Sequence, residues 1–145
     1  MRVSTRGRYG LHIMLQLAMR ADGQPLSLRQ MAQAQGVSDK YLEQIVSLLL
    51  REKLVVGRRG ANGGYQLARA CEEITAGEIL RALEGTTAST PCAEEGRREC
   101  VQAPVCVVAE LLTNVREAVD ALLFSTTLAQ LAARQQDLGM DGHMR

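Results

Sequence analysis

Three of the chain's four cysteines, Cys92, Cys100 and Cys106, lie within one short segment. Seven residues separate the first pair and five separate the second, so neither has the two-residue spacing typical of zinc knuckles. Thiolates far apart in sequence can still meet at an iron–sulfur cluster when the segment folds around it. The spacing disfavours zinc but leaves a cluster, zinc and reactive thiols open. Cys71, outside this segment, is predicted to be a small apolar residue at the core.

Length and composition predict a small globular protein with a real core. The chain has 145 residues, of which 46% are hydrophobic, enough for one domain extended by a helix or two. No apolar run approaches the roughly 20 residues that span a bilayer, and the basic start MRVSTRGRYG lacks a secretory signal's apolar stretch. We therefore expect a cytoplasmic protein without membrane contact, where a disulfide framework is disfavoured. With two histidines and no combination of nucleophile, base and orienting residue, we do not expect an enzyme.

The net charge of +1 conceals two halves of opposite sign. Residues 1–70 carry eleven Lys and Arg against four Asp and Glu, giving +7, whereas residues 71–145 carry six against twelve, giving −6. A basic half joined to an acidic one is typical of a nucleic-acid-binding module with a regulatory or assembly module. Chance clustering of surface charge is the alternative.

Three helices are predicted in the basic half. Apolar residues at helical spacing indicate a first helix within residues 4–21. Ser27 and Gln30 form a capping-box pattern that opens a short second helix ending at Gly36. Ser38 is placed to cap a third helix. Its core-facing stripe is predicted to be Leu42, Ile45, Val46 and Leu49.

The opposite face of the third helix is polar and has the side chains that read DNA. Two helices joined by a tight turn, the second with a continuous polar row, have the layout of a helix-turn-helix unit. Lys and Arg contact phosphates, Gln pairs with adenine and Glu accepts from the cytosine amino group. A solvated helix face is the alternative. The row consists of Lys40, Glu43, Gln44, Ser47 and Arg51.

A β-hairpin is predicted directly after this helix. The apolar run 54–56, which contains two β-branched valines, leads through a glycine-rich turn containing Asn62-Gly63 to residues 65–67. We expect Arg58 and Arg59 at the tip, where an arginine can enter a narrow, A·T-rich minor groove. A hairpin after a recognition-like helix is the wing of a winged helix.

The acidic half favours an assembly role. Thr75 and Glu78 are in capping-box register, so a short helix begins there and ends near Gly85. A long helix is predicted after Cys106, with a shorter helix and a loose tail following it. The long helix needs a partner for its apolar stripe, and a second copy would suit a palindromic operator. Packing against the chain's own first helix is the alternative. The stripe consists of Val108, Leu111, Leu112, Val115, Val119 and Leu122.

Four motifs in order, STRGRYGL, YLEQIVSLL, RRGANGGYQLAR and ITAGEILRALEG, resemble the winged helix-turn-helix repressors that include IscR, NsrR, RirA and CymR. The resemblance covers nearly the whole chain and implies a mainly α fold, with a small β-hairpin wing and a long dimerisation helix. It divides the chain into a DNA-binding domain (1–84), a cysteine loop (85–106), the dimerisation and C-terminal helices (107–135) and a flexible tail (136–145). By this resemblance, residues at the DNA are Ser38, Lys40, Tyr41, Glu43, Gln44, Arg58 and Arg59, with Arg59 in the minor groove.

The same resemblance implies a cofactor. Three cysteines between the helix that ends near Gly85 and the long helix after Cys106 mark the cluster-binding members IscR, NsrR and RirA, whereas CymR lacks them. The fourth ligand departs from the family, because Ala109 stands where IscR-like proteins have histidine and Arg8 where NsrR-like proteins have a carboxylate from the partner's first helix. His12, Glu110 or an external small thiol are the candidates, and a 2Fe–2S cluster is favoured over 4Fe–4S.

We therefore expect a homodimeric DNA-binding regulator that senses cluster supply, iron, nitric oxide or redox state through a cluster held by the three cysteines. The alternative is a cluster-free regulator that uses reactive thiols, zinc or a partner enzyme as its signal.

Overall fold

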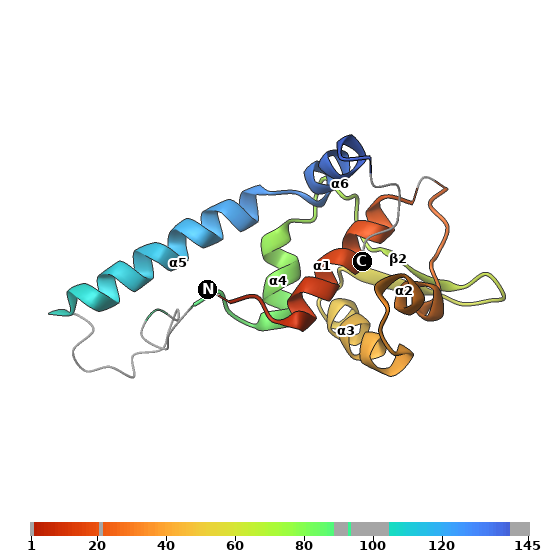
Figure 1. Ribbon diagram of the computed structural model, residues 1–145, viewed down its shortest axis with the longest axis horizontal. Helices are drawn as coiled ribbons and strands as arrows, with labels where there is room; N and C mark the ends of the chain where they lie inside the picture. Colours follow the sequence, from red (N-terminus) through yellow and green to blue (C-terminus); the bar gives the residue numbers. More distant parts are fainter. Residues whose placement is uncertain (1, 21, 89–92, 94–104, 140–145) are drawn as a thin grey trace.

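The computed structural model describes residues 2–20, 22–88, 93 and 105–139. These residues form helices and one antiparallel hairpin, as predicted (Figure 1). In chain order the elements are α1 (Thr5–Ala18), α2 (Leu28–Gln35), α3 (Asp39–Arg51), β1 (Val55–Arg58), β2 (Gly64–Leu67), α4 (Ala76–Glu84), α5 (Val107–Ser125) and α6 (Leu128–Asp137).

Side-chain caps set most of the helix starts. The predicted capping boxes are present at α2, between Ser27 and Gln30, and at α4, between Thr75 and Glu78. Helix α6 has a third box that the sequence analysis did not identify. It also continues to Asp137, two residues into the segment predicted to be a tail.

Helix α1 lies at the centre of the domain, and α4 crosses it closely. Gly10 faces Leu83 and Gly7 faces the Glu84 carboxylate, so neither position has room for a methyl group. Glu84 also accepts hydrogen bonds from the backbone N–H of Ser4, at 3.1 Å, and from its hydroxyl. The start of α1 is therefore joined to the end of α4.

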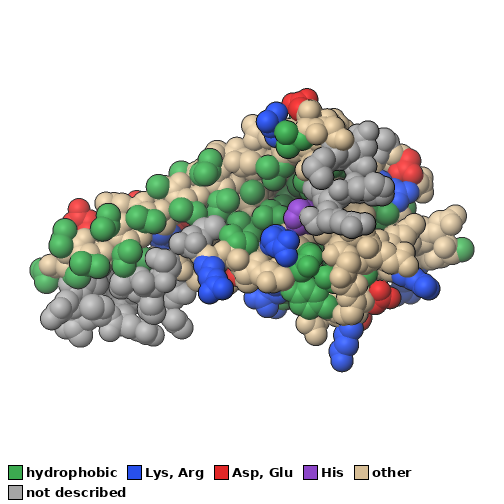
Figure 2. Space-filling view, viewed as in Figure 1, with side chains coloured by type: hydrophobic (Ala, Val, Ile, Leu, Met, Phe, Trp, Pro, Cys, Tyr) green, Lys and Arg blue, Asp and Glu red, His purple; other side chains and the backbone are tan. Residues whose placement is uncertain are grey.

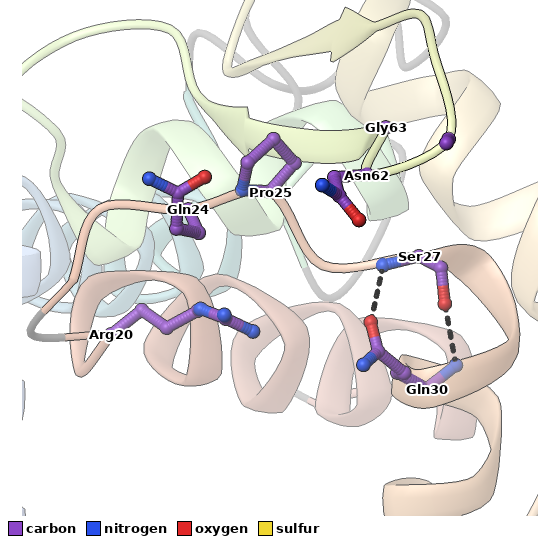
Figure 3. Close-up of a pocket in the computed structure, with 8 residues that line it drawn as sticks. Arg20, Gln24, Pro25, Ser27, Gln30, Asn62 and Gly63 are labelled. Carbon is purple, nitrogen blue, oxygen red and sulfur yellow. Dashed lines mark hydrogen bonds between the residues drawn. The ribbon is translucent and has the colours of Figure 1, made fainter.

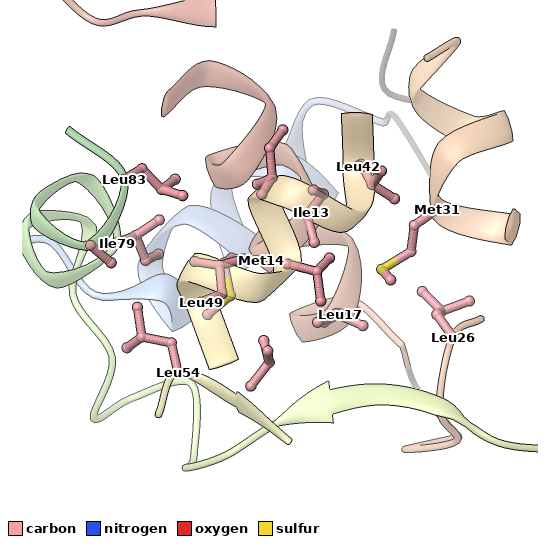
Figure 4. Close-up of a cluster of buried hydrophobic side chains, with 14 of the residues drawn as sticks. Ile13, Met14, Leu17, Leu26, Met31, Leu42, Leu49, Leu54, Ile79 and Leu83 are labelled. Atoms are coloured by element: carbon pink, nitrogen blue, oxygen red, sulfur yellow. The ribbon is translucent and has the colours of Figure 1, made fainter. Parts of the chain in front are cut away.

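The core is built around α1 and α3 (Figure 4). The predicted stripe of α3 is buried, because Leu42, Ile45 and Leu49 are 0% exposed and Val46 is 2% exposed. Met14 of α1 and Leu128 of α6 are also fully buried. The last helix is thus part of the same core as α1 and α3, although it follows the long α5 in sequence.

Strands β1 and β2 pair in the register Val55↔Leu67 to Arg58↔Gly64. An isolated antiparallel bridge between Leu26 and Tyr65 pairs the segment before α2 with the edge of β2 that faces away from β1. The hairpin projects from the body on the opposite side from α5 (Figure 1).

Helix α5 leaves the domain and extends away from it (Figure 1). Its base is held where Phe124 lies against α4, with the Arg81 guanidinium 4.5 Å from the ring centroid. Gly77 makes this approach possible, since a side chain there would lie 2.5 Å from the ring. Within the described residues, none of the helices combines the length and apolar character needed to cross a bilayer.

The α1–α4 crossing generates a stability prediction. Gly10→Ala should lower the free energy of unfolding by about 1 kcal/mol or more, because overpacking costs more than the gain in helix propensity. The neighbouring Leu83 is only 2% exposed and has no free space to enter. Urea unfolding measures the change. The control is Gly57→Ala, whose new methyl would meet only Tyr65 at 3.9 Å. Equal stabilities of the two variants would contradict the close crossing.

Candidate DNA-binding surface and cysteine segment

Helix α3 presents its polar row to solvent. Ser38 caps the helix, accepting a hydrogen bond from the backbone N–H of Tyr41 at 3.2 Å. Gly36, in the left-handed conformation with φ 67°, ends α2 and makes the tight turn between the two helices. The row predicted to read DNA is exposed along its length: Lys40, Glu43, Gln44, Ser47 and Arg51.

Tyr41 differs from this row because it also packs against the core. Its ring lies edge-on to Tyr9 of α1, with centroids 6.0 Å apart. The Arg8 guanidinium lies 4.7 Å from the Tyr9 centroid on the same helix. Tyr41 therefore joins the recognition helix to α1, and a role for it at DNA stays a prediction.

The two arginines of the wing occupy different positions. Arg59 is exposed in the turn, as predicted. Arg58 is instead the last residue of β1, and its Nε donates to Gln66 Oε1 at 2.7 Å. Arg58 therefore adjoins the turn at the outer end of β1, which extends two residues beyond the run 54–56, and its guanidinium is bonded within the wing.

A polar hollow of about 510 Å³ lies between the wing turn and the start of α2 (Figure 3). The Ser27–Gln30 capping pair forms part of its wall, and Asn62 reaches it from the wing. Arg20 lines it too, but its guanidinium is held by both oxygens of Asp22 at 2.8 and 2.9 Å. The hydrogen bond from Arg20 lowers the pKa of Asp22 to about 2, so the pair is ionised at neutral pH.

Cys106 is the one cysteine of the three-cysteine segment that the structure describes. It is the N-cap residue of α5, is half-buried and makes no side-chain capping hydrogen bond. The thiol therefore stands at the N-terminus of α5. Cys92 and Cys100 lie outside the described residues, and among the residues that the structure describes no three His, Cys, Asp or Glu side chains come together around a metal position.

Cys71 has the inert environment that the sequence predicted. It is half-buried against the core, and its sulfur lies 3.5 Å from a carboxylate oxygen of Glu72. Burial, and then the hydrogen bond to Glu72, raise the pKa of this thiol. Cys71 is accordingly a matched control for the thiols of the cysteine segment.

The two protein candidates for a fourth ligand lie in different places. His12 is half-buried on α1, where burial and then the charge of Arg8 lower its pKa, so its imidazole is neutral at pH 7. Glu110 is exposed one turn after Cys106, and its backbone N–H donates to the Cys106 carbonyl at 3.1 Å. The outer end of α5 points away from α1 (Figure 1). The structure therefore brings Glu110, and not His12 of the same chain, near Cys106.

One face of α5 is apolar and open to solvent (Figure 2). The exposed fractions are 58% for Val108, 60% for Leu111 and 67% for Leu122. Val115, between them, is 43% exposed. These four residues, called the α5 seam below, recur at the spacing of a two-helix seam. Two residues of the predicted stripe, Leu112 and Val119, are half-buried to one side of it.

The model of the family described as "Iron-dependent Transcriptional regulator" matches residues 3–134. The chain belongs to the Rrf2 family. The turn between α2 and α3, the β1–β2 wing and the long α5 are thus parts of an Rrf2-type transcriptional regulator that binds DNA. Its relatives are regulators and not enzymes, in agreement with the sequence analysis.

Rrf2 relatives of two kinds match nearly the whole chain. CymR of Bacillus subtilis is 43% identical over 133 residues, 92% of this chain and 91% of that protein. Its solved structure, described as that of the global cysteine regulator, has a TM-score of 0.75 at 42% identity, covering 92% and 98% of the two chains. The structure of T. potens IscR has a TM-score of 0.77 at 34% identity, covering 97% and 92%. Fold similarity thus does not separate the two kinds of regulator.

The sequence analysis did not predict the hydrogen bond between Arg58 and Gln66 in this Rrf2 wing. Gln66 lies on β2, two positions from the partner of Arg58, and such diagonal neighbours share a face of an antiparallel pair. The register would have indicated this contact once the strand ends were known. The hollow of Figure 3 had no sequence signal, because it forms where the wing turn approaches the connection between α1 and α2.

Proposed function

We propose that this chain is a homodimeric repressor that binds a palindromic operator through α3 and the wing, and that an iron–sulfur cluster held by Cys92, Cys100 and Cys106 controls its binding. The observation that carries the proposal is the position of Cys106. This residue ends the cysteine segment and begins α5, the helix that bears the α5 seam. A ligand of this thiol therefore acts directly on the element that joins two copies.

The residues present fit such a cofactor. Three thiols can supply the soft anionic ligands that iron–sulfur clusters use. The free side chain of the Cys106 N-cap leaves its sulfur available to a ligand. When bound, the cluster supplies a centre that iron supply, nitric oxide or redox state can alter. The matching family is one of iron-dependent transcriptional regulators, which supports this proposal.

The dimer is supported by the α5 seam. Helix α5 lies outside the core of its own domain, so the seam stays in water in the single chain (Figure 2). Burying such side chains contributes roughly 25 cal/mol per Å² of apolar surface. A second copy covers the seam symmetrically, and two related recognition helices then match a palindromic site.

The fourth ligand follows from the same arrangement. His12 is neutral, as a metal ligand must be, but it belongs to the domain and not to the outer end of α5. In this proposal His12 therefore comes from the second copy, and Glu110 of the same chain is the competing ligand. Two irons are favoured over four.

A cluster-free, thiol-based regulator is the second candidate. It is favoured by the 43% identity to CymR, whose structure is that of a global cysteine regulator. In that case the thiols of the cysteine segment respond without bound iron.

The DNA surface generates the first test of this function. Arg59→Ala should weaken binding, and Glu43→Ala should change base preference, each by roughly 1–3 kcal/mol. Fluorescence anisotropy on duplexes selected from a random pool measures both. Arg134→Ala, at an exposed position of α6, is the control and should bind as the parent chain does. Equal losses on every sequence for both variants would disprove base reading by Glu43.

The α5 seam generates a test of assembly. Leu111→Asp should give monomers, because it places a charge in an apolar interface, and sedimentation velocity measures the mass. Leu111 is 60% exposed in the single chain, so the monomer should keep its fold. Ala121→Asp adds the same charge at an exposed position on another side of α5 and should leave the dimer intact. If the Leu111 variant keeps the parent's mass, the interface lies elsewhere.

The cysteine segment generates the decisive test. Anaerobically purified protein should be coloured and contain iron and sulfide, and Cys92→Ala, Cys100→Ala or Cys106→Ala should each remove most of this absorbance. Cys71→Ala should leave it unchanged, since the raised pKa and half-buried position of Cys71 disfavour ligation. Colourless, iron-free parent protein would favour the thiol-based candidate, and bound zinc would exclude the cluster.

The same preparation identifies the fourth ligand. His12→Ala should shift the cluster spectrum and increase its lability, and Glu110→Ala should not. The reverse result would assign Glu110, and two unaltered spectra would leave an external thiol or water as the ligand.

A further inference from the structure

Two hydrogen bonds through the side chain of Gln66 form a relay that links the wing to the segment between α1 and α2. Arg58 Nε donates to Gln66 Oε1 at 2.7 Å, and Gln66 Nε2 donates to the Gly23 carbonyl at 2.5 Å. Arginine can only donate and a carbonyl can only accept, so the residue between them must do both. Glutamine meets this requirement, whereas glutamate lacks the donor and lysine lacks the acceptor.

The inner part of the wing is packed on the core through Val55, Tyr65 and Leu67. Its outer part is open: a hollow of about 510 Å³ lies under the turn, and a second hollow of about 320 Å³ is lined by Gln66. Besides the relay, the backbone bridge between Leu26 and Tyr65 joins the wing to the segment between α1 and α2, with N···O distances of 3.0 and 2.8 Å. The angle of the outer part therefore depends on few bonds.

We propose that Gln66 is a positioning residue, which orients the wing so that Arg59 reaches the minor groove. The guanidinium of Arg58 is bonded to Gln66 at the end of β1, so Arg59 is left as the arginine of the turn. The inference rests on the proposed DNA contact of Arg59. An arginine in the groove senses its width, and hence A·T content, only when it is held at the right depth. Loss of the relay therefore reduces discrimination between flanking sequences more than it reduces overall affinity.

The test compares variants on two duplexes. The first is a duplex selected by the parent chain from a random pool, and the second has its flanking A·T pairs, those under the wing, replaced by G·C. Gln66→Met removes both hydrogen bonds, and Gln66→Glu keeps the contact to Arg58 but loses the one to Gly23. Both should reduce the affinity ratio of the two duplexes by about two- to tenfold, the range expected for one or two ordinary hydrogen bonds.

Two further measurements separate positioning from direct contact. The salt dependence of binding should keep the parent's slope in the Gln66 variants, because no phosphate contact is lost, whereas Arg59→Ala should lower the slope by about one contact. Hydrogen exchange of the Leu26 and Tyr65 amides should be faster in the Gln66 variants. Gln136→Met, at an exposed position of α6, is the control and should match the parent in every assay.

The outcomes distinguish this inference from the proposed function. If Arg59→Ala removes flank discrimination but neither Gln66 variant does, the positioning role is refuted and the wing contact stands. If Arg59→Ala leaves discrimination unchanged, the wing is not in the groove and both ideas are refuted. A lowered salt slope in the Gln66 variants would make Gln66 a direct DNA contact and would overturn the positioning role.

Discussion

The close approach of α4 to α1 is the contact on which the rest of this molecule depends. It requires glycine at positions 7 and 10, because Leu83 and Glu84 occupy the space of their missing side chains. Glu84 then binds the Ser4 cap of α1. Since α1 is also the helix against which α3 and α6 pack, the crossing determines where the recognition helix stands relative to the start of the cysteine segment.

Helix α4 connects α1 to the base of α5. Helix α4 contacts α1 through its end, and it contacts the base of α5 through Gly77, Arg81 and Phe124. A movement of α5 would therefore reach α4 through this base.

The wing follows a different physical rule from the core. The core is held by many apolar contacts, so truncating one of its side chains leaves a cavity and lowers stability. The inner part of the wing shares in that core through Val55, Tyr65 and Leu67. Its outer part is held by a bridge and a polar relay beside two hollows, so the position of the turn depends on individual hydrogen bonds. Such an element can adapt to DNA at little cost in global stability.

The sequence by itself determined what local chemistry controls. Ser27 and Gln30, and likewise Thr75 and Glu78, began their helices where the capping pattern predicted, because a cap involves residues three apart. The buried stripe of α3 followed from helical periodicity in the same way. The four motifs also sufficed to indicate the family, which the match over residues 3–134 confirmed.

Only the tertiary structure decided which surfaces stay open and which side chains meet. Of the apolar stripe predicted on α5, only the α5 seam is exposed, because Leu112 and Val119 are half-buried. Helical periodicity does not show which side of a helix its neighbours cover. The tertiary structure paired the Arg58 side chain with Gln66, because strand ends and register depend on pairing partners. It separated His12 from the Cys106 end of α5, since the direction in which a helix leaves its domain is set by packing at its base, here Phe124 on Gly77.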